Sequence, residues 1–371
     1  GRTVRAFFGM IPDPVQQGAG FAAPFRWDVP LLEGYDSTVV ANHARRPALD
    51  RFFGISGPGV GPALAEFAPE VAIVCGWQSR FLWQATSACR RLHVPMLVRG
   101  DSNALRRRPA WKRWVQRRHL ARYAGYLAMG SSNATFYREL GFPPHRIHFA
   151  PHSIDPTPLL ARLASDDAAR SASRDRLGIP TGSTCFVFVG KLRSMKRPFD
   201  LLGAFTLAAA RRADIHLLFV GSGELDASLR AAAARSRTSV SFARFLRQSE
   251  IGAAYGAADA LVLPSDFAET WGLVVNEAMA CGLPIVVSDR VGCGPDLVRE
   301  GETGFTFPFG DTSALADRLV RLAADPDARG RMGRSARRLV EEKYSIARSV
   351  EGTLAGIDAV LLPDEPYVFT A

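Results

Sequence analysis

The chain has 371 residues, of which 47% are hydrophobic and 22% are charged, with a formal net charge of +10. This composition excludes an intrinsically disordered chain, and the length is sufficient for two domains of ordinary size. No run of eighteen apolar residues occurs, so a membrane-spanning helix is not expected.

The N-terminal residues and the cysteines indicate the compartment. The first residues, GRTVRAFF, lack the apolar stretch and cleavage site of a secretory signal. The five cysteines, at positions 75, 89, 185, 281 and 293, are not spaced as metal ligands. We therefore expect free thiols and a cytoplasmic protein, with a Cys281–Cys293 bridge as the less favoured alternative.

Apolar runs alternate with helical patterns in the first half. A long loop rich in Gly and Pro spans residues 9–34, and a loop of this length inside a compact domain is usually functional or mobile. A helix is expected near Arg80–Leu92. The expected strands are Val4–Phe8, Val71–Val74, Pro95–Val98, Tyr126–Met129 and Arg146–Ala150. Several end in small or polar loops, which predicts a ligand-binding edge of a parallel sheet.

The positive charge is concentrated in the first half. Residues 1–155 contain 20 Lys and Arg against 10 Asp and Glu, whereas the remainder contains 26 of each. The stretch Arg106–Arg122, RRRPAWKRWVQRRHLAR, predicts a basic amphipathic helix that can lie on an anionic membrane surface. A basic helix packed on its own domain by Trp and Leu fits the pattern equally well. No nucleic-acid module accompanies this stretch, so nucleic acid is not an expected partner.

A domain boundary is expected in the middle of the chain. Residues 156–176 have a helical composition and precede the linker GIPTGST. We therefore predict a first domain of residues 1–176 and a second domain of residues 177–345. The segment 346–371 is expected to cross back to the first domain.

The second half also alternates strands and helices. The expected strands are Cys185–Val189, Ile215–Val220, Val240–Phe242, Ala260–Pro264 and Ile285–Ser288, with helices covering the sheet from Thr312 to Lys343. After the first strand, Gly190 allows a ligand to approach the backbone closely. Lys191 and Lys196 can then place ammonium groups on two phosphates. A solvated basic loop is the alternative.

Two glutamates mark the stretch from Leu261 to Phe307. Glu269 lies in the loop after a strand, and Glu277 lies in a helix expected at about Leu273–Cys281, which Gly282 ends. Strand, acidic loop, helix and strand form a right-handed crossover unit, and its helix N-terminus can bind phosphate through backbone amides. The alternative is that Glu277 is a solvated helix residue, and that the negative charge of Glu269 only interacts favourably with the positive end of the helix dipole.

The pattern E-T-W-G-L-V-V-N-E-A-M-A-C-G-L-P resembles the E-x7-E signature of retaining nucleotide-sugar glycosyltransferases of family 4, the glycosyl transferases group 1. Gly190-Lys191 followed by Lys196 is similar to a second motif of that family, although relatives most often have Arg in place of Lys191. The resemblance covers nearly the whole second half and part of the first. It implies an α/β protein of the GT-B fold, in which two Rossmann-like parallel-sheet domains face each other across a cleft.

The resemblance implies an enzyme of the EC 2.4 class. It would move a hexose-type sugar from a nucleotide diphosphate sugar, UDP before GDP, to a hydroxyl of a glycan, lipid-linked glycan or small molecule. Polysaccharide biosynthesis on the inner face of the plasma membrane is the expected setting, and neither a cofactor nor a metal is expected. The alternatives are a nucleotide-sugar epimerase or hydrolase, and a non-enzymatic module that binds nucleotide sugars or polyanions.

The resemblance also assigns roles to residues. As catalytic residues, Glu269 would hold the hydroxyls of the donor sugar, while Lys191 and Lys196 would stabilise the leaving diphosphate. Glu277 would bind the ribose. The remaining donor-binding residues are Gly190, Phe245, Arg247, Thr270, Trp271, Gly272 and Leu273.

Acceptor-side residues are expected in the first half. Trp77 and Asp101 are the candidates, and a packing aromatic or a turn residue is the alternative for each. Relatives often have a His in a first-domain loop, but the loop Arg99-Gly100-Asp101-Ser102 has none. The role of that His therefore passes to Asp101 or is absent.

Overall fold

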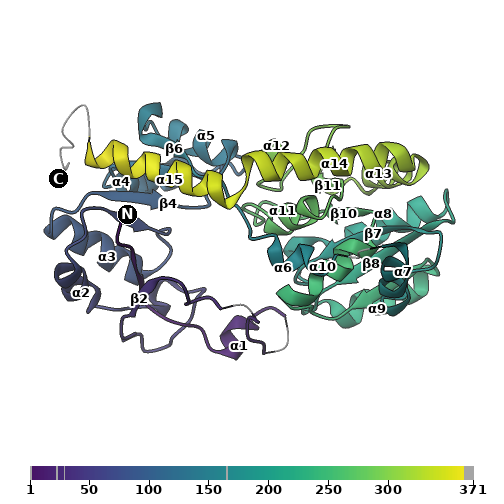
Figure 1. Ribbon diagram of the computed structural model, residues 1–371, viewed down its shortest axis with the longest axis horizontal. Helices are drawn as coiled ribbons and strands as arrows, with labels where there is room; N and C mark the ends of the chain where they lie inside the picture. Colours follow the sequence, from purple (N-terminus) through teal and green to yellow (C-terminus); the bar gives the residue numbers. More distant parts are fainter. Residues whose placement is uncertain (1, 22–23, 29, 164–165, 363–371) are drawn as a thin grey trace.

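The computed structural model describes residues 2–21, 24–28, 30–163 and 166–362. Figure 1 shows two α/β halves lying side by side along the long axis of the molecule. Each half is organised around a parallel sheet, which confirms the predicted fold class.

The first half contains a four-stranded parallel sheet in the order β3-β4-β5-β6. Its strands are β3 (Ala72–Val74), β4 (Met96–Arg99), β5 (Gly125–Ala128) and β6 (Ile147–Phe149). The central strands β4 and β5 are almost entirely buried, as their continuous apolar runs predict. The carboxyl ends of these strands share one edge, where Asp101 follows β4.

A separate two-stranded parallel sheet lies at the N-terminus. It pairs β1 (Arg5–Phe8) with β2 (Asp36–Val39). The sequence did not predict β2, because its residues, DSTV, are largely exposed and form no apolar run. The predicted long loop therefore connects these two strands.

Helices and short 3-10 turns complete the first half. They are α1 (Pro14–Gln17), η1 (Phe52–Gly54), α2 (Val60–Phe67), α3 (Arg80–Arg91), α4 (Ala110–Leu120), α5 (Ser131–Glu139) and η2 (Pro144–Arg146). The predicted basic helix is α4, which begins only after Pro109. Of its apolar residues, Leu120 is buried, whereas Trp111 and Trp114 are each 63% exposed. The two Trp side chains thus do not pack the helix on its own domain.

The second half contains a six-stranded parallel sheet in the order β12-β11-β10-β7-β8-β9. The strands are β7 (Thr184–Val189), β8 (Ile215–Val220), β9 (Val240–Ala243), β10 (Ala260–Leu263), β11 (Ile285–Ser288) and β12 (Gly304–Phe307). Five of them were predicted within a residue or two, and β12 was not predicted as a strand. Because β7 and β10 are neighbours, the loops that follow them lie side by side.

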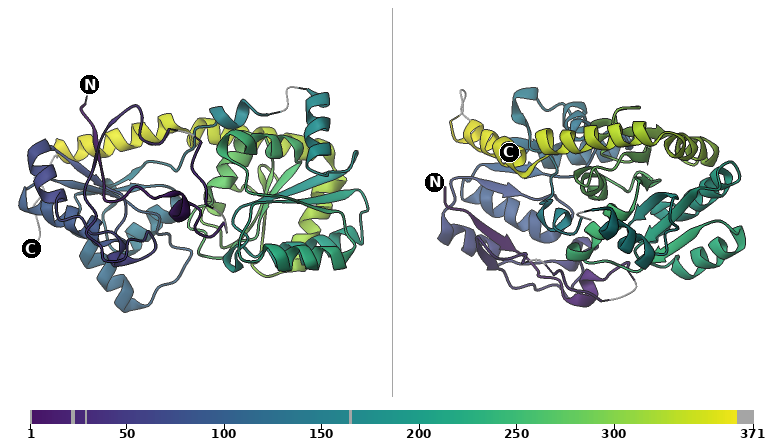
Figure 2. Two further views of the ribbon diagram at one scale, coloured as in Figure 1. Left: turned by 90° about the horizontal axis from the view of Figure 1, so that it is seen from below. Right: turned by 45° about the vertical axis from the view of Figure 1, so that its right-hand side comes forward.

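Helices cover both faces of this sheet (Figure 2), with a separate apolar core on each face. The helices and the one 3-10 turn of the described second half are α6 (Thr157–Leu160), α7 (Asp167–Arg176), η3 (Ser194–Lys196), α8 (Pro198–Ala209), α9 (Asp226–Ser236), α10 (Gln248–Ala257), α11 (Leu273–Ala280), α12 (Gly294–Leu297), α13 (Thr312–Ala324) and α14 (Pro326–Lys343).

The last helix, α15 (Ile346–Leu361), runs back along the first half, as the yellow helix in Figure 1 shows. It contacts β5 and β6. Its Gly356 is so close to Leu127 and His148 that an added methyl group would lie 2.9 and 3.3 Å from their side chains. Residues 363–371, the end of the segment expected to cross back, lie outside the described residues.

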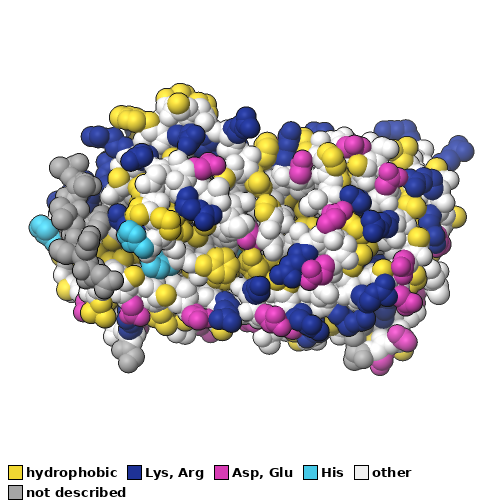
Figure 3. Space-filling model, turned by 90° about the horizontal axis from the view of Figure 1, so that it is seen from above, with side chains coloured by type: hydrophobic (Ala, Val, Ile, Leu, Met, Phe, Trp, Pro, Cys, Tyr) yellow, Lys and Arg dark blue, Asp and Glu magenta, His cyan; other side chains and the backbone are white. Residues whose placement is uncertain are grey.

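The surface charge differs between the two halves. On the face shown in Figure 3, Asp and Glu side chains gather mainly over the second half, at the right. This agrees with the excess of positive charge in residues 1–155. Within the described parts of the chain, no helix is both long enough and apolar enough to cross a membrane.

Candidate active site

The loops after β7 and β10 bring together two of the predicted catalytic residues. The Nζ atom of Lys196, in η3, donates a hydrogen bond to Oε2 of Glu269. The Oγ atom of Ser265 donates to the same carboxylate oxygen at 3.1 Å. Both charged side chains are only 13% exposed. An unpaired charge that is this deeply buried would cost free energy, and the pairing of Lys196 with Glu269 avoids that cost.

The N-terminus of α11 lies next in the chain after this pair. Gly272 is its N-cap residue and has φ of +101°, a left-handed conformation that favours glycine. The first amides of a helix have no acceptor within the helix, and they carry the positive end of its dipole. The amides of Gly272 and Leu273 therefore suit an anionic ligand, and their contact with the donor stays a prediction.

Glu277 lies in the interior of α11, eight residues after Glu269. The Oη atom of Tyr255, in α10, donates a hydrogen bond of 2.7 Å to Glu277 Oε2. Burial raises the pKa of the Glu277 carboxyl, and the bond from Tyr255 opposes that shift. The Glu277 side chain is half-buried and hydrogen-bonded, so it is not the freely solvated helix residue of the alternative, and ionisation there costs free energy.

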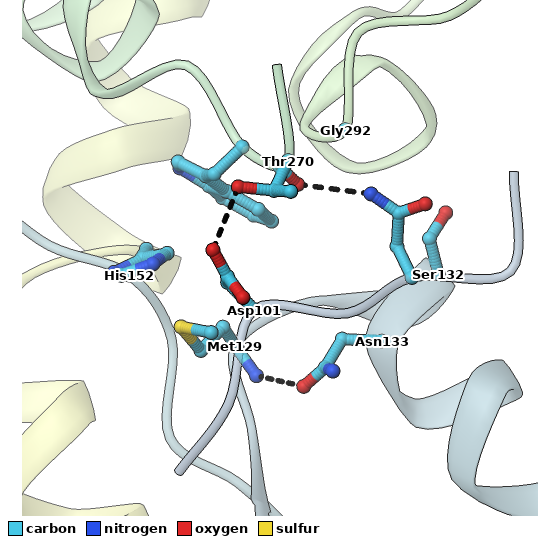
Figure 4. Close-up of a pocket in the computed structure, with 9 residues that line it drawn as sticks. Asp101, Met129, Ser132, Asn133, His152, Thr270 and Gly292 are labelled. Carbon is cyan, nitrogen blue, oxygen red and sulfur yellow. Dashed lines mark hydrogen bonds between the residues drawn. The ribbon is translucent and has the colours of Figure 1, made fainter. Parts of the chain in front are cut away.

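The two halves touch directly beside Glu269. Thr270 Oγ1 donates to Asp101 Oδ2 at 2.9 Å, and Asn103 Nδ2 donates to the Thr270 carbonyl oxygen at 3.0 Å. Figure 4 shows these contacts across a small pocket between the halves. Asp101, an acceptor-side candidate, thus lies next to the predicted donor-binding loop.

His152 lines the same pocket and was not assigned to the site from the sequence. Its ring lies across from Asp101 in Figure 4, and its centroid is 5.6 Å from that of Trp271. Burial, together with the nearby Arg99 cation, lowers the pKa of His152 to about 4, so the imidazole is neutral near pH 7. The sequence showed only that His152 lies where the chain leaves the first half.

Trp271 is buried between the halves. Its Nε1 donates to Asn276 Oδ1 at 2.8 Å, and Asn276 Nδ2 donates to the His152 carbonyl oxygen at 3.2 Å. The ring packs against Gly130, where an added methyl group would lie 2.4 Å from the indole. Trp271 therefore fixes the loop that carries Glu269, and its predicted donor contact stays a prediction.

The structure gives Trp77 a packing role. Its ring stacks on Phe136, with a centroid distance of 6.5 Å, and lies against Gly100. Its indole faces the core of the first half rather than the pocket lined by Asp101. A role for Trp77 toward the acceptor stays a prediction.

Two further predicted residues, Lys191 and Phe245, lie against a segment of the first half. Lys191 Nζ donates to the Ala19 carbonyl oxygen at 2.7 Å, and Phe245 packs against Phe21. Arg247 is exposed at the start of α10, and Gly190 has φ of +151° beside Lys196. The sequence marked the loop of residues 9–34 as functional or mobile, but its destination could not be deduced.

Across the described ranges, no group of three or more His, Cys, Asp or Glu side chains is arranged to hold a metal ion. The cysteines at 75, 89, 185, 281 and 293 are all free thiols, so the alternative Cys281–Cys293 bridge is not formed. That the reaction needs no metal stays a prediction.

Comparison with known families identifies the second half. Residues 169–339 match the family described as Glycosyl transferases group 1. Spore coat protein SA of Bacillus subtilis is 31% identical over 196 residues, which are 50% of this chain and 52% of that protein. A D-inositol 3-phosphate glycosyltransferase of an Arthrobacter species is 36% identical over 175 residues, or 46% and 41% of the two chains. The chain spans about half the length of the curated relatives it matches.

Solved structures resemble nearly the whole fold. The complex of Anabaena HepE with UDP and glucose superposes with a TM-score of 0.70 at 17% identity, and the match covers 89% of this chain and 88% of that one. Sucrose-phosphate synthase from Thermosynechococcus elongatus gives a TM-score of 0.64 at 18% identity, covering 85% and 82% of the two chains. These similarities define the two-sheet arrangement as the GT-B fold. Within that fold, residues 169–339 of the second half carry the match to the Glycosyl transferases group 1 family.

Proposed function

We propose that this protein is a retaining glycosyltransferase. It moves a hexose-type sugar from a nucleotide diphosphate sugar to an acceptor hydroxyl. The observation that carries the proposal is the meeting of Lys196, Glu269 and the N-terminus of α11 at the edge where β7 and β10 end. A cation, a carboxylate and free amides at one place match the phosphates and hydroxyls of such a donor.

The proposed reaction exchanges one bond at the anomeric carbon for another. The bond from this carbon to the diphosphate oxygen breaks as the bond to the acceptor oxygen forms on the same face of the sugar. The proton of the acceptor hydroxyl passes to the leaving phosphate oxygen. Lys191, Lys196 and the amides of Gly272 and Leu273 stabilise the negative charge on the leaving diphosphate. Glu269 orients the sugar, and Glu277 binds the ribose.

The donor is UDP-linked in this proposal, with GDP next. The structure of Anabaena HepE was determined in complex with UDP-glucose, and its fold is the same. The acceptor is a glycan, a lipid-linked glycan or a small molecule, which Asp101 faces from the first half. Polysaccharide biosynthesis is the proposed setting.

The membrane surface is the proposed location of the acceptor. The first nine residues of α4 are exposed or half-buried, and they combine two outward Trp side chains with Lys112, Arg113, Arg117 and Arg118. Basic residues attract anionic lipid headgroups, and Trp inserts at the interface. The protein would then be cytoplasmic and peripheral on the inner face of the plasma membrane.

Vesicle sedimentation tests this location. Reversing the charges of Lys112 and Arg118 to Glu, or changing Trp111 and Trp114 to Ser, should release the protein from vesicles of anionic lipid while turnover of a soluble acceptor survives. Arg108 is unsuitable for this test because its guanidinium donates to the Asn103 carbonyl oxygen at 2.7 Å. Full retention of vesicle binding by both variants would contradict the location.

A thermal-shift screen against UDP, GDP, ADP and their sugars tests the function, because a ligand that binds the folded state raises Tm. Acceptor-dependent release of nucleoside diphosphate should follow with the donor that binds. An epimerase or hydrolase would instead give an epimer or free sugar from the donor alone at comparable turnover. Failure of every nucleotide to bind at millimolar concentration would overturn the proposal.

A further inference from the structure

A segment of the first half lies over the predicted nucleotide site of the second half. We call it the N-terminal cover and define it as residues 17–21 and 24–28. It belongs to the long connection between β1 and β2. Figure 1 shows α1, where the cover begins, below the junction of the two halves and away from the four-stranded sheet.

Aromatic rings of the cover contact Phe245, the residue predicted to lie at the base of the nucleotide. The ring centroid of Phe21 is 4.6 Å from that of Phe245, and the centroid of Phe25 is 4.4 Å from it. Trp27 packs edge-on against Phe25 at 5.2 Å. The rings of Phe21, Phe25 and Phe245 are half-buried, so part of each stays accessible. Such accessible rings are surfaces on which nucleobases stack.

Polar contacts hold the cover at the phosphate side of the site. Lys191 Nζ donates to the Ala19 carbonyl oxygen at 2.7 Å and lies 4.8 Å from the ring centroid of Phe21. Ser222 Oγ donates to the Phe21 carbonyl oxygen. A Lys ammonium has three hydrogen-bond donors, so Lys191 keeps donors for a phosphate while the cover fixes its position.

The other end of the cover is anchored at α10. Asp28 Oδ2 accepts hydrogen bonds from the backbone N of Ser249, at 3.2 Å, and from its Oγ. A carboxylate is favourable at the first turn of a helix. This turn begins directly after Arg247, the second residue predicted to lie near the base. The cover is thus tied to the second half on both sides of Phe245.

We propose that Phe21 and Phe25 determine the specificity for the donor nucleotide, by forming with Phe245 an aromatic wall on which the base stacks. The inference rests on the proposed function and deepens it, because the base pocket then takes residues from both halves. The rings of Phe25 and Phe245 touch, so the wall has no slot between them. A base lies on the accessible part of the cluster, and this limited area favours a pyrimidine over a purine.

Isothermal titration of the full chain with UDP, GDP and inorganic pyrophosphate tests this wall. Native protein should bind UDP more tightly than GDP. Phe25→Leu and Phe21→Leu should each weaken UDP binding on the order of tenfold and reduce the preference for UDP over GDP, because a Leu side chain offers no ring for stacking. The affinity for pyrophosphate should stay unchanged in both Leu variants. Phe25→Tyr keeps an aromatic ring and should therefore keep the native preference for UDP over GDP.

The matched control is Phe53→Leu, since Phe53 is 69% exposed and packs on Phe52, within the first half. If the Phe25 and Phe21 variants weaken all three ligands equally, or change none of them, the cover is only a structural contact and the inference is wrong. If native protein binds UDP and GDP equally well, the wall does not select. If native protein binds no nucleoside diphosphate at all, the proposed function itself fails.

Discussion

Lys196 and Glu269 are paired with each other through a hydrogen bond from Nζ to Oε2, although the two residues are predicted to hold opposite parts of a donor. Each side chain is mostly buried, and a buried charge is costly unless it has a partner. The pair therefore satisfies both charges. A bound donor would replace it with a phosphate on Lys196 and sugar hydroxyls on Glu269.

This exchange predicts that binding and turnover separate in Glu269→Gln. Turnover should fall by about 100-fold or more, since the carboxylate that orients the sugar is lost. UDP affinity should be equal or higher, because Lys196 no longer has a competing carboxylate. Lys196→Ala should weaken both. Steady-state kinetics and UDP titration measure these effects. Glu302→Gln, an exposed acid paired with Arg299, is the control, and near-native turnover of Glu269→Gln would contradict the assignment.

Local patterns in the sequence were sufficient for the framework of the site. The apolar runs placed β7 and β10, and the glycine at 282 placed the end of α11, because burial and backbone conformation are local preferences. Since parallel neighbours end at one edge, Lys196 and Glu269 could be expected on the same side of the sheet.

Contacts between distant segments were beyond the sequence. The pairing of Lys196 with Glu269 depends on the exact course of two loops. The position of His152 and the contact of Phe25 with Phe245 depend on how the two halves of the protein meet. The periodicity of the sequence carries no information about either arrangement. The exposed strand β2 was missed for a different reason, because pairing with β1 rather than burial makes it a strand.

The burial of Glu277 predicts that removing its charge has opposite effects on stability and on nucleotide binding. Its carboxyl has a raised pKa in the folded state because of burial, so the folded protein binds a proton there more readily than the unfolded chain does. Ionisation near pH 7 therefore costs stability, and this cost is relieved as the pH falls through the folded pKa toward the usual range for Glu.

Glu277→Gln should consequently have a Tm at pH 7 at least as high as native, with the difference shrinking at acid pH. Gln can still accept the hydrogen bond from Tyr255. Affinity for UDP should fall by about tenfold, since the charged partner of the ribose hydroxyls is lost. Tm measured against pH and UDP titration check both parts. A variant less stable than native at pH 7 would show that the charge is stabilised by contacts other than those seen.

The contact between Asp101 and Thr270 predicts an acceptor-specific defect. Asp101→Asn can keep a hydrogen bond to Thr270 Oγ1, so the loop should stay in place while the charge toward the acceptor is removed. Turnover with acceptor should fall by about tenfold or more, whereas UDP affinity and Tm should stay near native. An equal loss of donor binding would show instead that Asp101 only supports the Thr270 loop.

The assignment of charge stabilisation to Lys191, Lys196 and the start of α11 predicts activity without a divalent metal. Turnover should persist in excess EDTA, and added Mg²⁺ or Mn²⁺ should change it less than twofold. Initial rates with the donor identified by titration provide the measurement. Abolition of turnover by EDTA, with recovery on adding Mg²⁺, would show that these cations are insufficient to stabilise the leaving diphosphate.

Asp296, in the second half, caps the N-terminus of α5 in the first half and so links the two halves. Its carboxylate, in α12, accepts from the backbone N and Oγ of Ser131 at 2.8 and 3.0 Å, and from Tyr344 Oη at 3.0 Å. The N-cap position of α5 is Gly130, which offers no side chain. The cap of α5 is therefore complete only while the halves are together.

Asp296→Ala should destabilise the chain by about 0.5–2 kcal/mol, as loss of a cap does, and should also loosen the closed arrangement. The expected signs of loosening are a larger radius of gyration by X-ray scattering and a raised KM for donor. Asp311→Ala is the matched control, because Asp311 caps α13 within the second half by accepting from Ala314 N at 2.8 Å. It should lower stability by a similar amount and leave the radius and KM unchanged. Identical scattering and KM for the two variants would show that Asp296 is an ordinary cap with no part in closure.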